Sequence, residues 1–415
     1  MIARPSIVID SDGHVVEINE TYEHIEPAYR DRRPIYTQAS QGNIVRLIDG
    51  KVWGPQAESG FAGINGNFFP PIGKGLHYRR MGTYNPWARL VDMDTDNIDV
   101  AVLYPTDELP LTVTPDAGFA TARAKAYNNW LFKYCQVSPK RLKGIGLVAL
   151  QGIDGAIAEM NRSVTELGMV GIQIGCTVRE DTLLSDQRLY PFWAEAERLN
   201  VAIAIHGPAL PSFFRGYFDV NRPDHILEVS HMAHAFAQMM ACSNVVTSGV
   251  LERFPDLRIA FLEAGGGWVP YWMNRMDEYN EVAPERWANL SAKPSEYIKN
   301  GRVFFSCEPG DEFIPHFIEH VGEEALLFAS DCLHFDALFV GEPGHDGRPY
   351  PGTVSTLLGR TDVAETAIRK MMLDNSLKFY NFDRSGLGAI GDPVALVEPD
   401  KTRYSVMPGT VSARD

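Results

Sequence analysis

The sequence predicts an α/β fold, a (β/α)₈ TIM barrel with long insertions after its first and fifth strands. Eight short apolar segments, rich in β-branched and small residues, alternate with segments whose apolar residues recur at three- and four-residue spacing. Alternating strands and helices build a parallel sheet, and eight such strands close a barrel. Several of the strands also end in histidine or a carboxylate, the position at which barrels of this kind carry their active sites.

The strands are taken from the apolar runs in chain order, beginning with SIVID. They are expected at Ser6–Asp10, Asp99–Tyr104, Lys143–Leu150, Val170–Gly175, Val201–His206, Arg258–Glu263, Val303–Cys307 and Leu326–Asp331. Amphipathic helices are expected between and after them, at Thr121–Cys135, Gly155–Leu167, Leu189–Leu199, Ala233–Phe254 and Val363–Phe379. Residues 1–383 are therefore expected to form one barrel domain, and residues 384–415 a C-terminal arm.

Two insertions interrupt the alternation. Residues 19–84 are rich in Gly, Pro, Asn and aromatic residues, and residues 207–232 follow directly on a strand that ends in His206. Long loops inside a compact domain are usually functional or flexible, so both insertions are expected near the active site.

Composition excludes several classes of protein. The net charge of −15 over 415 residues opposes unassisted binding to nucleic acid or to an anionic membrane. The first residues lead straight into a strand and no segment is apolar enough to span a bilayer, so a cytoplasmic protein is expected. Five scattered cysteines without a CxxC pair do not describe a disulfide framework.

The candidate metal ligands are predicted from spacing along the strands. Asp12 and His14 are two residues apart, so an extended backbone points both to one side. Bulky and small residues alternate before His206, which should place its ring inside the barrel, and Asp331 ends the eighth strand. This donor set suits Zn²⁺, or Mn²⁺ or Fe²⁺ where carboxylates dominate. Taken alone, a strand-end histidine such as His206 is more often a hydrogen-bonded core residue than a ligand.

The sequence resembles the amidohydrolase-related family over roughly residues 6 to 383. The motifs that carry the resemblance are VIDSDGHVVE, NPWARLVDMDTDNIDVAVLYPT, IAIHGP, GVLERFPDLRIAFLEAGGGWVPYW and FASDCLHFDA. The family includes aminocarboxymuconate-semialdehyde decarboxylase and the resorcylate and dihydroxybenzoate decarboxylases. The resemblance implies a barrel in which Asp12, His14, His206 and Asp331 hold one divalent ion, with Asp-x-His as a variant of the family's His-x-His or Glu-x-His pair.

One departure from the family pattern concerns the acid/base. The decarboxylases carry a histidine just before the Gly-rich turn of strand six, whereas this chain has Ala264 there, preceded by Glu263. We expect His234 to replace it first, because imidazole titrates near neutral pH. Glu263 and, more weakly, Glu308 are alternatives. His234 could instead be an ordinary packing residue, and Glu263 could brace the turn.

Further residues are assigned to substrate or to support of the ligands. Arg215 could pair with a substrate carboxylate, and Phe213 and Trp268 could line an apolar pocket. His334 and Asp336 could orient the ligands. All five could also be ordinary loop or packing residues.

Two kinds of reaction fit such a metal centre, and a third alternative is a protein without catalytic activity. The resemblance favours non-oxidative decarboxylation of a small aromatic or unsaturated carboxylate, a C–C lyase reaction. The missing strand-six histidine favours a hydrolase or hydratase acting on an ester, lactone, amide or thioester, with Asp331 taking a proton from metal-bound water. A catalytically inert binding protein is the minor alternative. The expected partners are a small-molecule substrate and a second copy of the chain in a homodimer.

Overall fold

The structure is a computed structural model that describes residues 2–38, 44–53, 81–178, 182–207, 226–332, 337–344 and 346–395. Eight parallel strands form its central sheet in the order β1-β5-β6-β7-β8-β9-β10-β11. Their bounds are β1 (Ile9–His14), β5 (Val100–Tyr104), β6 (Leu142–Leu147), β7 (Gly171–Ile174), β8 (Ala202–Ile205), β9 (Ile259–Phe261), β10 (Val303–Cys307) and β11 (Leu326–Phe328). All eight coincide with the expected strands, which confirms the predicted barrel.

The barrel closes where β1 meets the segment that follows β11. The amide of Asp331 donates to the carbonyl of Asp12 at 3.0 Å, and the amide of His14 donates to the carbonyl of Cys332 at 2.7 Å. β1 runs on to His14, past the expected end at Asp10, and its register against β5 shifts between Asp10 and Gly13. The DGH motif is therefore part of the strand.

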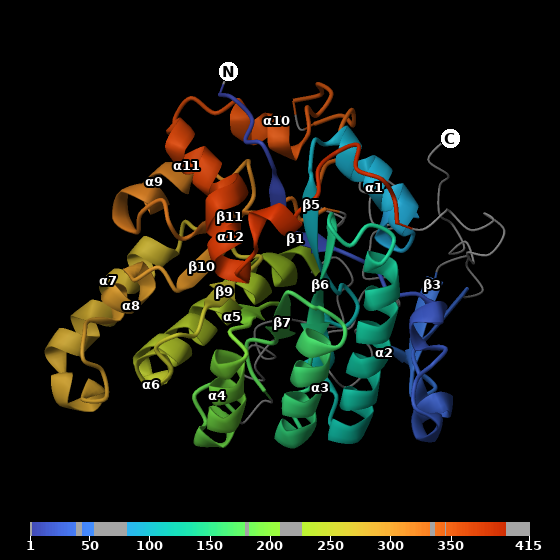
Figure 1. Cartoon of the computed structure of the whole chain (residues 1–415). Helices are drawn as coiled ribbons and strands as arrows, with labels where there is room; N and C mark the ends of the chain where they lie inside the picture. Colours follow the sequence, from blue (N-terminus) through green and yellow to red (C-terminus); the bar gives the residue numbers. More distant parts are fainter. Residues whose placement is uncertain are drawn as a thin grey trace.

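Helices surround the strands (Figure 1). Their bounds are α1 (Pro86–Thr95), α2 (Ala117–Cys135), α3 (Ile153–Thr165), α4 (Tyr190–Arg198), α5 (Ile226–Thr247), α6 (Val250–Arg253), α7 (Val269–Val282), α8 (Pro294–Lys299), α9 (Ile314–His320), α10 (Thr353–Leu358), α11 (Glu365–Arg369) and α12 (Asn375–Tyr380). Side-chain caps start two of them: Asn85 accepts from the amides of Trp87 and Ala88 before α1, and Asp116 accepts from that of Phe119 in α2. The five expected helical segments are all helical, whereas α1 and α7 to α10 were not predicted.

Side chains on the barrel strands alternate between two apolar layers, as the pattern of β8 predicted. Ala202 and Ala204 belong to the inner cluster, with Val102 and Phe304. Ile203 and Ile205 belong to the outer cluster that packs against the helices. His206 follows Ala204 with the same parity, so its side chain starts from the inner face of the sheet.

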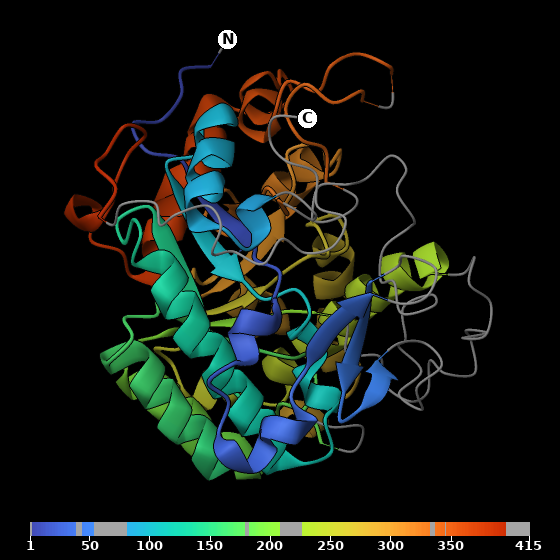
Figure 2. The ribbon, with the colours of Figure 1, turned by 90° about the vertical axis from the view of Figure 1, so that its right-hand side faces the viewer.

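A small antiparallel sheet lies within the first insertion, where the sequence analysis expected a loop. Its strands are β2 (Ile35–Gln38), β3 (Ile44–Ile48) and β4 (Lys51–Trp53), and β3 turns into β4 through Asp49 and Gly50, both with positive φ. Figure 2 shows this sheet in blue, outside the barrel strands. Ile48 packs with Phe119 and Ala122 of α2, which attaches the sheet to the barrel wall.

The described part of the C-terminal arm lies at the N-terminal end of the barrel strand β6. The amide of Gly388 donates to the carbonyl of Lys140, and that of Ala395 to the carbonyl of Val137, both just before β6. No helix in the described ranges is long and apolar enough to cross a membrane.

Candidate metal centre

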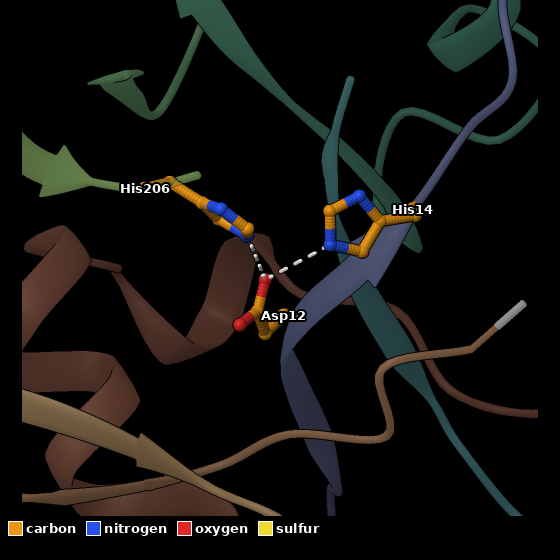
Figure 3. Close-up of side chains that lie close together, drawn as sticks. All are labelled: Asp12, His14 and His206. Carbon is orange, nitrogen blue, oxygen red and sulfur yellow. Dashed lines mark hydrogen bonds and ion pairs between the residues drawn. The ribbon is translucent and has the colours of Figure 1, made fainter. Parts of the chain in front are cut away.

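Three predicted ligands meet where β1 and β8 end. The Nε2 atom of His206 lies 3.1 Å from Oδ1 of Asp12, and Nε2 of His14 lies 3.5 Å from the same oxygen. Figure 3 shows both rings turned toward that carboxylate. One donor atom from each residue lies within 4.8 Å of the others, and all three side chains are buried. Two imidazoles and a carboxylate in this arrangement can hold a divalent ion between them.

The fourth predicted ligand, Asp331, reaches the same place from beyond β11. Its Oδ1 lies 3.5 Å from Nε2 of His14. Asp331 has a φ of 48°, and Glu263, which follows β9, has a φ of 57°. The left-handed region is costly for residues other than glycine and is concentrated at functional sites. Both carboxylates are therefore held in strained backbone at the ends of barrel strands.

Hydrogen bonds orient the ring of His14. Its Nδ1 lies 2.8 Å from the carbonyl oxygen of Pro105, which follows β5. A carbonyl can only accept, so Nδ1 carries a proton, and Nε2, which faces Asp12 and Asp331, is the nitrogen left to bind a metal. This is the tautomer that a metal-binding histidine needs, and its partner is the kind of support that such ligands usually have.

Ser306 of β10 orients Asp12. Its hydroxyl donates to Oδ2 of Asp12 at 3.2 Å and accepts from the amide of Glu263 at 2.8 Å. Burial alone would raise the pKa of the Asp12 carboxyl, but the imidazoles of His206 and His14 together outweigh it and hold that pKa well below its usual range. Asp12 is thus an anion whose Oδ1 stays directed at the two rings.

A second pair of groups adjoins the ligands. Oε2 of Glu263 lies 2.9 Å from Nδ1 of His234 in α5 and 3.4 Å from Nδ1 of His206. Glu263 therefore connects one predicted ligand with the predicted acid/base. The side chains of His234 and Glu263 are each 18% exposed, in contrast to the fully buried His206. This pair is the part of the cluster that solvent can reach.

The remaining predicted site residues fall into two groups. Arg215, Phe213, His334 and Asp336 lie outside the described residues, so their assignments stay predictions. Trp268 is the N-cap residue of α7 and meets Phe305 edge to face, with ring centroids 5.6 Å apart, in the layer between strands and helices. A contact between Trp268 and substrate also stays a prediction.

Three supports of the site were not predicted from the sequence. Asp10 accepts from the amide and hydroxyl of Ser330 at 2.9 and 2.6 Å. Arg89 of α1, which is 1% exposed, donates to the carbonyl of His14 at 2.8 Å. For Ser306, the parity of VFFSC could have shown an inward-facing hydroxyl. For Arg89, no spacing in the sequence points to His14.

Comparison with known proteins gives a family match over nearly the whole barrel. The sequence profile described as amidohydrolase matches residues 9–382. The chain is 26% identical over 328 residues to 2-amino-3-carboxymuconate-6-semialdehyde decarboxylase of Dictyostelium discoideum, covering 77% of this chain and 81% of that protein. It is 28% identical over 268 residues to gamma-resorcylate decarboxylase of Rhodococcus jostii, covering 59% and 76%.

A solved structure shows the same fold. The crystal structure of 5-carboxyvanillate decarboxylase from Novosphingobium aromaticivorans superimposes with a TM-score of 0.64 at 18% identity, covering 91% of this chain and 96% of that one. That enzyme was crystallised with manganese and 4-hydroxy-3-methoxy-5-nitrobenzoic acid.

Proposed function

This chain belongs to the amidohydrolase family, and from that premise we propose that it is a metal-dependent carboxy-lyase. Its reaction would be the non-oxidative decarboxylation of a small aromatic or unsaturated carboxylate. The observation that carries the proposal is the convergence of Asp12, His14 and His206 on one point, with Asp331 beside them. The carboxymuconate-semialdehyde and gamma-resorcylate decarboxylases, which the chain matches over 81% and 76% of their length, support the same reaction. A 2-keto-4-carboxy-3-hexenedioate hydratase of Sphingobium sp., matched at 24% identity over 65% of its length, keeps the hydratase alternative open to test.

The residues present fit one divalent ion. Asp12, His14, His206 and Asp331 would hold it, since they offer two imidazole nitrogens and two carboxylates in a buried place. A bound cation there would bind the oxygens of the substrate and stabilise negative charge that develops in the reaction. Zn²⁺ suits this donor set, and Mn²⁺ suits it equally because half of the donors are carboxylates; the manganese in the carboxyvanillate decarboxylase structure favours testing both.

The residues of the chain supply the proton. In decarboxylation the bond to the carboxyl carbon breaks, carbon dioxide leaves, and the electron pair stays on the substrate carbon until a proton reaches it. We assign this proton to His234, whose Nδ1 is held by Glu263 at 2.9 Å, so that Nε2 is the nitrogen that gives the proton to carbon and then takes another from solvent water. Glu263 stabilises the protonated ring, and it does so from a strained strand end that fixes its direction. The second carboxylate, Asp331, lies beside His14 and serves as a base that can accept a proton.

The experiment is a product assay on the metal-loaded protein with a panel of ortho-hydroxybenzoates and muconate-like acids. We expect release of carbon dioxide and, in D₂O, one deuterium on the carbon that lost it. His206→Ala should lose both the bound ion and turnover, because it removes a ligand. The matched control is His24→Ala, the same change at an exposed histidine, which should behave as wild type.

Other results would point elsewhere. Cleavage of esters or lactones with ¹⁸O from water entering the product, and no carbon dioxide, would establish the hydrolase or hydratase alternative with Asp331 as base. Purified protein that takes up no stoichiometric Zn²⁺ or Mn²⁺ would establish the inert binding protein. A homodimer and a cytoplasmic location stay predictions, the first to be checked by sedimentation equilibrium and the second by fractionation of cells.

A further inference from the structure

The barrel closes at a seam between β1 and the residues that follow β11. Side chains supply much of the hydrogen bonding across this seam. The strand order runs from β1 to β11, and the described parts of these two strands share no continuous ladder. Two backbone bonds cross the seam, from Asp331 to Asp12 and from His14 to Cys332. Three of the four proposed ligands, Asp12, His14 and Asp331, belong to these two segments. The seam therefore sets the distance between Asp331 and the other two.

Arg89 spans the seam from one side. Its Nη1 donates to the carbonyl of His14 at 2.8 Å, and Nη1 and Nη2 both lie 3.4 Å from the carbonyl of Cys332. The same guanidinium thus holds the backbone just after one ligand pair and just after the fourth ligand. The Cys332 carbonyl also accepts the amide of His14, so a single carbonyl gathers three donors.

Asp10 of β1 and Ser330, which follows β11, form a second side-chain link across the seam. The carboxylate of Asp10 accepts from both the amide and the hydroxyl of Ser330, and its Oδ1 lies 3.3 Å from the amide of Asp12. The Ser330 hydroxyl in turn accepts from the amide of Cys332 at 3.0 Å. Asp331 is held between these two anchored neighbours, Ser330 and Cys332.

Gly13, which has no side chain, lets Arg89 and Asp10 lie close to the backbone of β1. A Cβ at this position would lie 2.6 Å from Nη2 of Arg89 and 2.7 Å from Oδ2 of Asp10, closer than real Cβ atoms come. The guanidinium and the carboxylate therefore both press against the backbone of Gly13, between Asp12 and His14.

We propose that Arg89, together with Asp10 and Ser330, is a positioning residue that sets the place of Asp331 relative to Asp12 and His14. The inference rests on the metal centre of the proposed function and adds to it the groups that hold the fourth ligand. Asp331 needs such groups, because its φ of 48° persists only where the surroundings impose it. A lysine cannot replace Arg89, since an ammonium is a point donor without the planar fork that serves two carbonyls at once.

The test is the Zn²⁺ and Mn²⁺ affinity of Arg89→Lys, measured by competition with a chelator, beside the melting temperature of the metal-free protein. Loss of an outer support of a metal ligand typically weakens metal binding by roughly ten- to hundred-fold. We expect a weakening of that size and a fall in kcat larger than any rise in KM. The matched control is Arg141→Lys, another buried arginine that donates to backbone carbonyls, those of Asp99 and Ile98 at the start of β5.

A purely structural role would lower the melting temperature of both variants alike and leave the metal affinity of the folded protein unchanged, and that result would overturn the inference. If Arg89→Lys fails to fold, Ser330→Ala decides the question, because it removes the two hydroxyl contacts to Asp10 and Cys332 at little cost in volume. Unweakened metal binding by Ser330→Ala would then reject the proposal. Wild-type protein that binds neither ion would instead reject the metal centre itself.

Discussion

Asp331 is the residue at which binding of the ion and chemistry can be separated. Its side chain lies 3.5 Å from His14, and its backbone adopts a φ of 48° that asparagine tolerates better than most residues. Asp331→Asn should therefore leave the fold and most of the bound metal intact while it removes the negative charge and the proton acceptor. We expect kcat to fall by about 10²- to 10⁴-fold, the usual worth of a general acid or base.

The control for this variant is Asp49→Asn, which makes the same change at the same kind of backbone, with a φ of 57°, on the β3–β4 turn. It should keep full activity. Two quantities are measured: the metal content, by elemental analysis, and the rate of turnover of the acid that the wild-type protein decarboxylates. Turnover of Asp331→Asn near the wild-type rate would contradict the role of the carboxylate.

Residue types at strand ends were enough to predict the candidate ligands. The alternation of bulky and small residues before His206, and the two-residue spacing of Asp12 and His14, predict which way these side chains point. In a strand the direction of a side chain depends on parity alone. The contact of Glu263 with His234 depends instead on the approach of α5 to the end of β9. No local pattern encodes such an approach, which is why sequence reasoning could offer both residues as alternatives but not as a pair.

At the scale of elements, β1 is the barrel strand whose composition, IDSDGH, is least like a strand, and its Gly13 leaves no room for a Cβ. Gly13→Ala would place a methyl group 2.6 Å from Arg89 and 2.7 Å from Asp10, neither of which can retreat in a buried seam. We expect a loss of about 1–3 kcal/mol in the free energy of unfolding, the usual cost of overpacking, and weaker metal binding in the same variant.

Denaturant unfolding and chelator competition measure the two effects of Gly13→Ala. Gly386→Ala is the matched control, since a Cβ there meets nothing within 4 Å. Equal stability and equal metal affinity of Gly13→Ala and wild type would show that the seam is loose.

The barrel strands and most long helices could be predicted because each lies in an apolar run or a helical pattern of several residues. This holds even for β9 and β11, whose three residues each lie within the longer apolar runs RIAFLE and LLFASD. The short elements could not. α8, α9 and α10 span six or seven residues, less than two turns, so a period of 3.6 residues has no room to show. β4 has only the three residues of Lys51–Trp53, and it is a strand because β3 pairs with it. α7 is long enough, but its Pro270 at the helix start resembles a break rather than a first turn.

For the molecule as a whole, a buried carboxyl beneath the small sheet should make stability depend on pH. Glu17 accepts from the amides of Asp107 and Glu108 at 2.9 and 3.1 Å. Burial, reinforced by the charges of Asp107 and Glu108 and opposed by Arg46, raises its pKa from 4.5 to about 8. Arg46 of β3 in turn pairs with Glu108 at 2.6 Å, so the group lies where the small sheet is joined to the barrel.

The direction of the effect follows from which state binds the proton. With a pKa near 8 in the folded protein and near 4.5 in the unfolded chain, Glu17 takes up a proton on folding between these values. Its contribution to stability is complete below pH 4.5 and is lost as the pH rises through about 8. Glu17→Gln carries no titrating proton, so the variant should lose less stability than wild type between pH 5 and 9. Urea unfolding across this range measures the difference, with the exposed Glu319→Gln as control. Parallel pH profiles for wild type and Glu17→Gln would mean that Glu17 is ionised throughout, held by the amides that it accepts from.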